Sequence, residues 1–320
     1  MKMKRNKQTI LTLVFGLLLC TAVYFYFGNT TQKWQMTMIT AAYYIIGGLG
    51  LNLIIGVSGQ FSLGHAGFIA IGAYSVGIVF QKNATLGGFG IGVIIGIIIT
   101  CLVALLIAVP TFRLKGDYLA IATLGFSEII RIVIQNLEIT GGASGLSYIV
   151  FDDITNQQMF LLMLLTIVIA IILIVNYVKS SQGRATTAIR EDEIAAESMG
   201  VNTTKYKTIT FLIGASLAAV AGAYFGPMNF VLKPGDFGFQ KSIDVLVIVV
   251  LGGMGSLTGT ILGGIFIAVV NTVLQNYTEF RMIFYAIALI AVMIFRPTGL
   301  LGNKEITDIF KKFKRKEAKS

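Results

Sequence analysis

Charged side chains are scarce in this sequence. Only 12% of its 320 residues are Asp, Glu, Lys or Arg, whereas 55% are hydrophobic. A soluble domain has about 25% charged residues, so this chain has too few of them to cover a water-facing surface. The composition therefore excludes an ordinary soluble protein and predicts that most of the chain faces lipid.

Reactive side chains are also few. His65 is the only histidine, and the two cysteines, Cys20 and Cys101, lie inside apolar runs and are typical of small packing residues. A lone histidine cannot build a metal site. The sequence has no His-Glu-x-x-His, Gly-x-Ser-x-Gly or phosphate-loop motif. We therefore expect that this chain is not an enzyme, binds no metal or cofactor, and does not itself hydrolyse ATP.

Long apolar segments fill the rest of the sequence. A helix needs roughly 20 apolar residues to cross the hydrocarbon, which predicts an all-α polytopic membrane protein with about ten membrane-spanning or re-entrant helices. We expect one transmembrane domain over residues 1–320, with a bundle over 9–300. The N-terminal run is interpreted as a retained first span and not as a signal peptide, because no small-x-small cleavage site follows it. The predicted spans are 9–28, 36–57, 66–81, 89–110, 117–137, 158–178, 208–230, 242–251, 259–276 and 281–296.

The positions of the 25 Lys and Arg residues predict the orientation of these spans. Eighteen of them fall in the termini and loops on one side, and four on the other. Loops rich in Lys and Arg face the cytoplasm, so both termini, the basic tail 301–320 and the loop 179–207 are expected there. The same distribution argues against nucleic acid as the reason for the net charge of +10.

Two glycine-rich breaks without charge join pairs of spans, at Gly56–Gly67 and Leu251–Thr260. Irregular backbone at membrane depth is tolerated only where it is buried in protein or lines a cavity. Paired breaks of this kind point to the transport pathway, although tight turns at the membrane surface would give the same pattern. The candidate path residues are Asn52, Gly59, Gln60, Ser62, His65, Gly255 and Ser256.

Few charged residues lie inside the predicted spans. Glu128 and Arg131 lie three residues apart, so they share a helix face and are predicted to form an intramembrane ion pair. The alternative is contact with a zwitterionic substrate or a second subunit. Asp244 is expected to cap the start of the span that follows Lys241.

Residues 179–207, called the island below, form a polar segment between two apolar runs. Nine of its residues are charged. As a single helix it would place small residues on one face, with Arg190, Glu193 and Glu197 on the other. Gly200 would end that helix, and Asn202 or Thr203 would cap the next. The alanine-rich face favours protein docking over lying on a bilayer. It comprises Ala185, Ala188, Ile189, Ala195, Ala196 and Met199.

Three blocks of sequence together resemble the LivM-type permease subunits of branched-chain amino acid ABC importers. The resemblance runs over about residues 40–300. The blocks are GLNLIIGVSGQFSLGHAGF at 50–68; RLKGDYLAIATLGFSEIIR at 113–131 with TGGASG at 140–145; and AIREDEIAAESMG at 188–200 with LGGMGSL at 251–257.

The resemblance implies a fold, partners and a location. It implies a multi-pass permease in the bacterial plasma (inner) membrane, paired with a LivH-type permease, two cytoplasmic ATPases that use ATP, and an extracellular binding protein. ABC permeases carry a Glu-Ala-Ala-x3-Gly signature that docks the ATPase, and Ala195, Ala196 and Gly200 fit its spacing. The acid departs from the signature, because Ile194 precedes Ala195 and the carboxylate is at Glu193.

The predicted function is therefore the translocation subunit of an importer for leucine, isoleucine and valine. An ABC permease of the same type for urea or another small solute is the first alternative. An ion-coupled secondary transporter is the second, but it would need buried carboxylates, and Glu128 is the one clear candidate.

Overall fold

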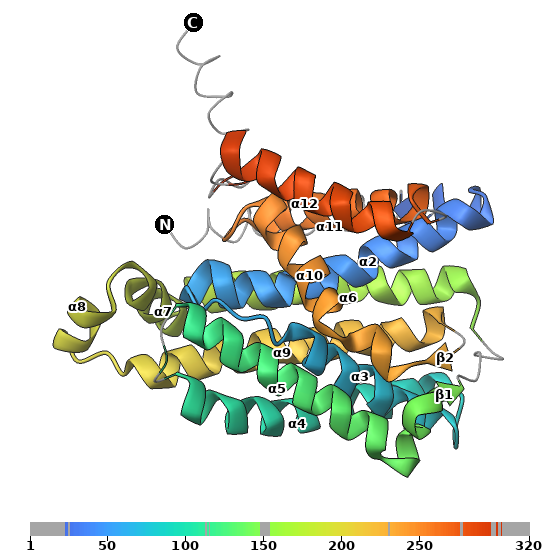
Figure 1. Ribbon diagram of the computed structural model, residues 1–320, viewed down its shortest axis with the longest axis horizontal. Helices are drawn as coiled ribbons and strands as arrows, with labels where there is room; N and C mark the ends of the chain where they lie inside the picture. Colours follow the sequence, from blue (N-terminus) through green and yellow to red (C-terminus); the bar gives the residue numbers. More distant parts are fainter. Residues whose placement is uncertain are drawn as a thin grey trace, which may run out of the picture.

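The computed structural model describes residues 23–24, 26–112, 114, 116–147, 154–229, 231–275, 278–295, 299 and 302. These residues form a mainly helical bundle (Figure 1). The α-helices are α2 (Gln32–Asn52), α3 (His65–Phe80), α4 (Leu86–Thr111), α5 (Asp117–Asn136), α6 (Asn156–Lys179), α7 (Ser181–Glu191), α8 (Glu193–Ser198), α9 (Thr203–Met228), α10 (Phe239–Gly252), α11 (Leu257–Val273) and α12 (Thr278–Phe295). The π-helix η1 (Leu53–Val57) continues α2, and the 3-10 turns are η2 (Glu138–Thr140), η3 (Gly142–Ser144) and η4 (Pro234–Phe237).

The nine predicted spans from 36–57 onward each coincide with a helix. The span 9–28 lies outside the described residues apart from its last turn, and so does almost all of the tail 301–320. Among the described residues, four helices are long and apolar enough to cross a membrane. They are Gln32–Val57, Leu86–Thr111, Asn156–Lys179 and Thr203–Met228.

Shorter helices complete the bundle. α3 and α11 are apolar but have 16 and 17 residues. α10 has 14 residues, which at 1.5 Å per residue reach only about 21 Å of the roughly 30 Å of hydrocarbon. A re-entrant element therefore describes α10 better than a full span.

The prediction of an all-α fold needs one correction. Strands β1 (Leu146–Ser147) and β2 (Val231–Leu232) pair antiparallel, with Leu146 opposite Leu232. α5 ends at Asn136, and Gly141, Gly142 and Gly145, which have positive φ, lie in and beside the 3-10 turns that lead to β1. Tyr74 in α3 donates a hydrogen bond of 3.0 Å to the Leu232 carbonyl and ties this small sheet to the bundle.

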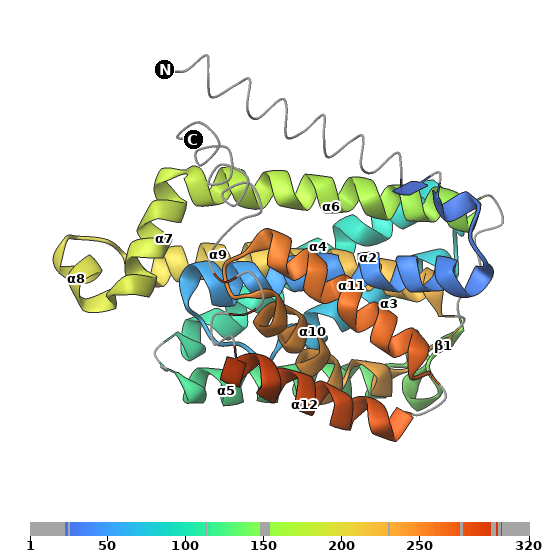
Figure 2. The same ribbon diagram turned by 90° about the horizontal axis from the view of Figure 1, so that it is seen from above.

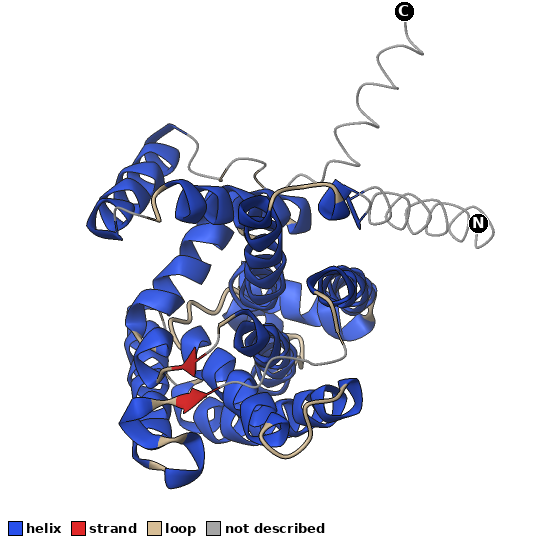
Figure 3. Cartoon of the chain, turned by 90° about the vertical axis from the view of Figure 1, so that its right-hand side faces the viewer, coloured by secondary structure: helices blue, strands red, loops and turns tan. Residues whose placement is uncertain are grey.

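The bundle has two distinct ends. The long helices run along its length, with α7 and α8 projecting at one end and the strand pair at the other (Figures 1 and 2). Figure 3 looks along this direction from the strand end, so that several helices are seen end on. The island thus lies at the end of the bundle opposite the strand pair.

Burial separates the central helices from the peripheral ones. In the most apolar stretch of α2 and η1, 89% of the residues are buried, against 33% in α4 and in α6. α2 packs against α6, α9, α10 and α11. The outer face of α4 exposes branched apolar residues such as Ile94 and Leu102. α2 is therefore the centre of the bundle, and α4 is suited to face lipid.

Small residues allow α3 and α9 to approach closely. A Cβ at Gly72 would overlap the Ala219 carbonyl, and one at Gly222 would overlap the Ile69 carbonyl. Such contacts are common between membrane helices, where van der Waals packing replaces the hydrophobic effect as the source of association. They fix α3 within the bundle and thereby position the start of α3, where the first glycine-rich break ends.

Candidate translocation path and coupling surface

The first glycine-rich break runs back into the bundle. α2 continues through η1 to Val57, and α3 begins at His65. The His65 ring lies beside Gly47, with 3.0 Å between Nε2 and the Gly47 carbonyl oxygen. Because Gly47 precedes Val57 by ten residues of helix, the connecting chain returns about 15 Å along α2. It is therefore not a tight turn at the membrane surface.

Polar side chains of this break are buried. Ser58, Gln60, Ser62 and His65 are each at most 3% exposed. Ser58 Oγ donates to Gln60 Oε1 (2.8 Å), and Ser62 Oγ accepts from the Gly64 amide (3.3 Å). Among the described residues, Gln60 Nε2 and His65 Nδ1 are buried without a hydrogen-bond partner. Buried polar atoms normally have a partner, so these two atoms are candidate contacts for a water molecule or a polar solute.

The second glycine-rich break is a short turn between α10 and α11. Gly253 and Gly255 have φ of 113° and 93°, a region that favours glycine. Ser256 accepts a hydrogen bond from the Gly259 amide (3.0 Å) and caps α11. This break has the local geometry of a turn, while its position is set by contact with α2.

Asn52 joins the two breaks. Its Nδ2 donates to the Ser256 carbonyl (3.0 Å), and its Oδ1 accepts from the Gly255 amide (2.7 Å). Gly56, one turn later, packs so closely on Gly255 that a Cβ there would overlap the Gly255 nitrogen. The structure thus brings Asn52, Gly255 and Ser256 together. Gln60, Ser62 and His65 are buried along the chain that returns beside α2, and Gly59 is exposed and packs against the island.

The predicted ion pair is present at the side of the bundle. Arg131 Nε donates to Glu128 Oε2 at 2.6 Å, and the side chains are 25% and 29% exposed. Glu128 Oε1 also accepts from the Phe239 amide (3.0 Å) at the start of α10. The prediction that Asp244 caps this helix is wrong, because α10 begins five residues earlier and Glu128 binds its first amide.

A polar groove near the strand end was not predicted from the sequence. Its volume is about 580 Å³. Asn271 Nδ2 donates to Tyr44 Oη (3.1 Å), and the Lys241 ammonium lies 5.5 Å from the centre of the Tyr44 ring. Its members come from distant segments, so no local pattern could reveal it. The groove is lined by Gln32, Lys33, Met36, Thr40, Tyr44, Asn229, Asn271, Thr272 and Gln275.

The island is divided into two helices, and the prediction of a single helix is wrong. The chain turns at Asp192, whose φ of −154° and ψ of 107° end α7. Its carboxylate accepts from the Ala195 amide (3.0 Å) and caps α8. Gly200, with φ of 81°, ends this segment as predicted, and Asn202 caps α9 through the Lys205 amide (2.9 Å).

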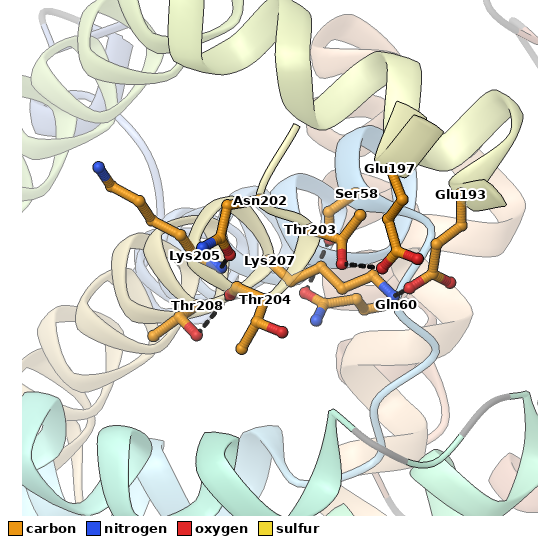
Figure 4. Close-up of polar contacts among 10 residues, drawn as sticks. All are labelled: Ser58, Gln60, Glu193, Glu197, Asn202, Thr203, Thr204, Lys205, Lys207 and Thr208. Atoms are coloured by element: carbon orange, nitrogen blue, oxygen red, sulfur yellow. Dashed lines mark hydrogen bonds and ion pairs between the residues drawn. The ribbon is translucent and has the colours of Figure 1, made fainter. Parts of the chain in front are cut away.

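Two acidic residues of α8 bind the start of α9 (Figure 4). Glu193 Oε1 pairs with Lys207 Nζ at 2.6 Å, and Glu197 Oε1 accepts from Thr203 Oγ1 at 2.7 Å. These contacts give Glu193 a structural role within this chain. They also fix which side of α8 faces outward.

The exposed side of α8 differs from the predicted docking face. Ala196 is only 6% exposed and packs within this chain, whereas Ala195 and Gly200 are exposed. Ile194 and Met199 are 73% and 84% exposed. The surface open to a partner thus combines two large apolar side chains with Ala195 and Gly200, and does not include Ala196.

Arg190 does not point away from the rest of the molecule, as the single-helix prediction implied. Its guanidinium Nη1 donates to the Gly56 carbonyl in the last turn of η1. The aliphatic part of its side chain lies against Gly59, where an added Cβ would be 3.1 Å from Arg190 Cγ. The island is therefore in direct contact with the first break.

These features define a polytopic helical membrane protein with a buried, glycine-rich polar centre and a separate polar surface at one end. Within the described ranges no group of three or more His, Cys, Asp or Glu residues could hold a metal ion. The chain belongs to the family described as branched-chain amino acid transport system, permease component, whose model matches residues 34–295. No solved structure matches this chain.

Curated relatives agree with the family. The chain is 37% identical to the high-affinity branched-chain amino acid transport system permease protein LivM of Salmonella typhimurium, over 83% of this chain and 68% of that protein. It is 36% identical to LivM of Escherichia coli K12, over 85% and 70%. It is also 33% identical to LivH of Salmonella typhimurium, over 48% of this chain and 50% of that protein.

Proposed function

We propose that this chain is the translocation subunit of an ATP-driven importer for branched-chain amino acids. The observation that carries the proposal is the family match over residues 34–295, supported by similarity to LivM proteins over most of the chain. The structure adds a buried polar centre in which two irregular segments meet at Asn52. Paired irregular segments of this kind point to solute-binding sites in transporters, and the buried Gln60 Nε2 and His65 Nδ1 offer polar atoms for a small solute.

The proposed assembly contains two different permeases. LivH proteins resemble half of this chain, so a LivH-type partner would have a related fold. Two ATPases on the cytoplasmic side and an extracellular binding protein would complete the importer, in the bacterial inner membrane. In this arrangement the island end faces the cytoplasm, as the distribution of Lys and Arg predicts.

The proposed ATPase-docking surface is the exposed side of α8. It presents Ile194 and Met199 beside the small residues Ala195 and Gly200. Large exposed apolar side chains are costly on a free surface in water and are suited to burial in a partner's groove. Glu193 contributes by holding α8 on α9 through Lys207 and not by touching the ATPase.

The test is ATP hydrolysis by the purified complex of both permeases and both ATPases. We expect hydrolysis to rise when the binding protein is added with leucine, and not when it is added with urea. Stimulation by urea but not by leucine would assign the alternative substrate. Failure of the ATPases to co-purify with this chain, together with solute transport that requires an ion gradient, would support a secondary transporter instead.

A further inference from the structure

α7 is firmly attached to the membrane helices on either side of it. The Tyr177 hydroxyl of α6 lies 2.9 Å from Thr186 Oγ1 in α7 and 2.6 Å from Thr210 Oγ1 in α9. Thr186 and Thr210 are fully buried. α8 follows α7 directly and is held on α9 by the Glu193–Lys207 pair. A displacement of α8 would therefore also act on α7 and, through α7, on α6 and α9.

Arg190 is the side chain through which α7 contacts the first break. Its guanidinium binds the Gly56 carbonyl, and the aliphatic part of its side chain lies against Gly59. Gly56 belongs to η1, a π-helix, and such widened turns are frequent at functional sites. Gly59, with φ of 70°, follows directly. The first break therefore begins with an irregular backbone, and Arg190 is in contact with it.

The contact continues to the second break. Gly56 packs on Gly255, and Asn52 binds both Gly255 and Ser256 through its amide group. A continuous set of contacts therefore leads from the island through Arg190, η1 and Asn52 to the turn between α10 and α11. Spatial continuity alone does not establish coupling, which has to be measured as an effect at one site of a change at the other.

We propose that Arg190 is a positioning residue that links the island to the translocation path. It holds the end of η1 in the position that keeps the two breaks together, so that displacement of α7 and α8 alters the contact at Asn52. This inference rests on the proposed function and adds a residue through which the ATP-driven step would reach the path.

The chain provides matched variants to test the link. Arg190→Met keeps a long apolar side chain against Gly59 but removes the guanidinium that donates to the Gly56 carbonyl. Arg190→Lys keeps a cationic donor and serves as the conservative rescue. Arg184→Met is the control, because Arg184 also lies in α7 but donates to the Lys179 carbonyl at the end of α6 (2.9 Å), away from the breaks.

Amide hydrogen exchange in the purified chain tests the link without any assumption about the substrate. We expect Arg190→Met to raise exchange in residues 53–60 and in residues 252–256 by about fivefold or more, the lower end of typical coupling between sites. Arg184→Met should leave both segments unchanged, and Arg190→Lys should restore most of the protection. Unchanged exchange in 53–60 would overturn the link, and a rise confined to 53–60 would overturn its extension to the second break.

Transport by the reconstituted complex tests the functional consequence. A merely structural defect would lower leucine uptake and ATP hydrolysis together. Loss of the link should leave ATPase co-purification and hydrolysis intact while uptake per ATP falls by about fivefold or more. Equal uptake per ATP in Arg190→Met and the unmodified complex would overturn the role. If the unmodified complex takes up no leucine, the proposed function is wrong. The exchange measurement would still show whether Arg190 links the island to the two breaks.

Discussion

At the scale of single residues, Asn52 shows how one buried amide determines the position of a distant segment. It is 1% exposed and uses both its donor and its acceptor on backbone groups of the second break. A buried side chain that satisfies two backbone groups gives specificity, because its removal leaves both groups without a partner. The sequence predicted Asn52 as a path residue but could not reveal its partners, which lie about two hundred positions away.

Replacing Asn52 should destabilise the protein in a measurable way. We expect Asn52→Ala to lower the free energy of unfolding by about 1–3 kcal/mol, the cost of leaving buried polar groups unsatisfied. Asn136→Ala is the matched control, since Asn136 is exposed and donates only to the Ile132 carbonyl of its own helix. Thermal unfolding in detergent measures both variants. Equal losses in the two would contradict the role given to Asn52.

At the scale of elements, the two breaks depend on a glycine contact that allows no side chain. Gly56→Ala should push η1 and the second break apart, because its Cβ would overlap the Gly255 nitrogen. We expect strongly reduced transport with protein still present in the membrane. Gly125→Ala in α5 is the control, since a Cβ there meets no atom within 4 Å. Normal transport by Gly56→Ala would show that close contact between the breaks is not needed.

The exposed and buried sides of α8 predict different phenotypes for two neighbouring alanines. Ala195→Arg places a charge on the exposed side and should abolish ATPase co-purification without loosening α8. Ala196→Arg forces a charge into a site that is 6% exposed and should instead disrupt the packing of α8 itself. Proteolysis within residues 193–203 distinguishes the two effects. ATPase binding by Ala195→Arg at the unmodified level would place docking elsewhere.

The sequence predicted helices better than it predicted how they end and meet. Apolar runs gave nine helices within a few residues, because burial in lipid requires long uninterrupted apolar stretches. The turn at Asp192 was not predicted, because a helical wheel cannot distinguish an aspartate that caps a helix from one inside a helix. The start of α10 was also misplaced, because the residue that binds its first amide is Glu128, from α5. Contacts between distant residues have no local pattern.

The parts of the candidate site that have a local sequence pattern were predictable, and the contacts between distant segments were not. Glycine-rich composition identified both breaks, and charge spacing identified the pair of Glu128 and Arg131. The contact of Arg190 with Gly56 could not be predicted, because it depends on how α7 is oriented after the turn at Ser180. The polar groove near the strand end was equally hidden, since its residues come from separate segments.

At the scale of the whole molecule, the two ends of the bundle should face different compartments. In a chain lacking Cys20 and Cys101, a cysteine at Ser181 in the island should resist an impermeant thiol reagent in intact cells. A cysteine at Gln81, just after α3 at the strand end, should react. Both positions are exposed, so the difference reports sidedness and not burial. Labelling of Ser181→Cys from outside would reverse the orientation.

The most direct test of the account is solute uptake by vesicles that contain the complete complex. The vesicles hold ATP inside, and the binding protein is supplied outside with labelled leucine or labelled urea. The account predicts that leucine accumulates only with ATP, that unlabelled isoleucine and valine compete, and that urea does not accumulate. ATP-dependent accumulation of urea without leucine, or leucine uptake that follows an ion gradient without ATP, would contradict it.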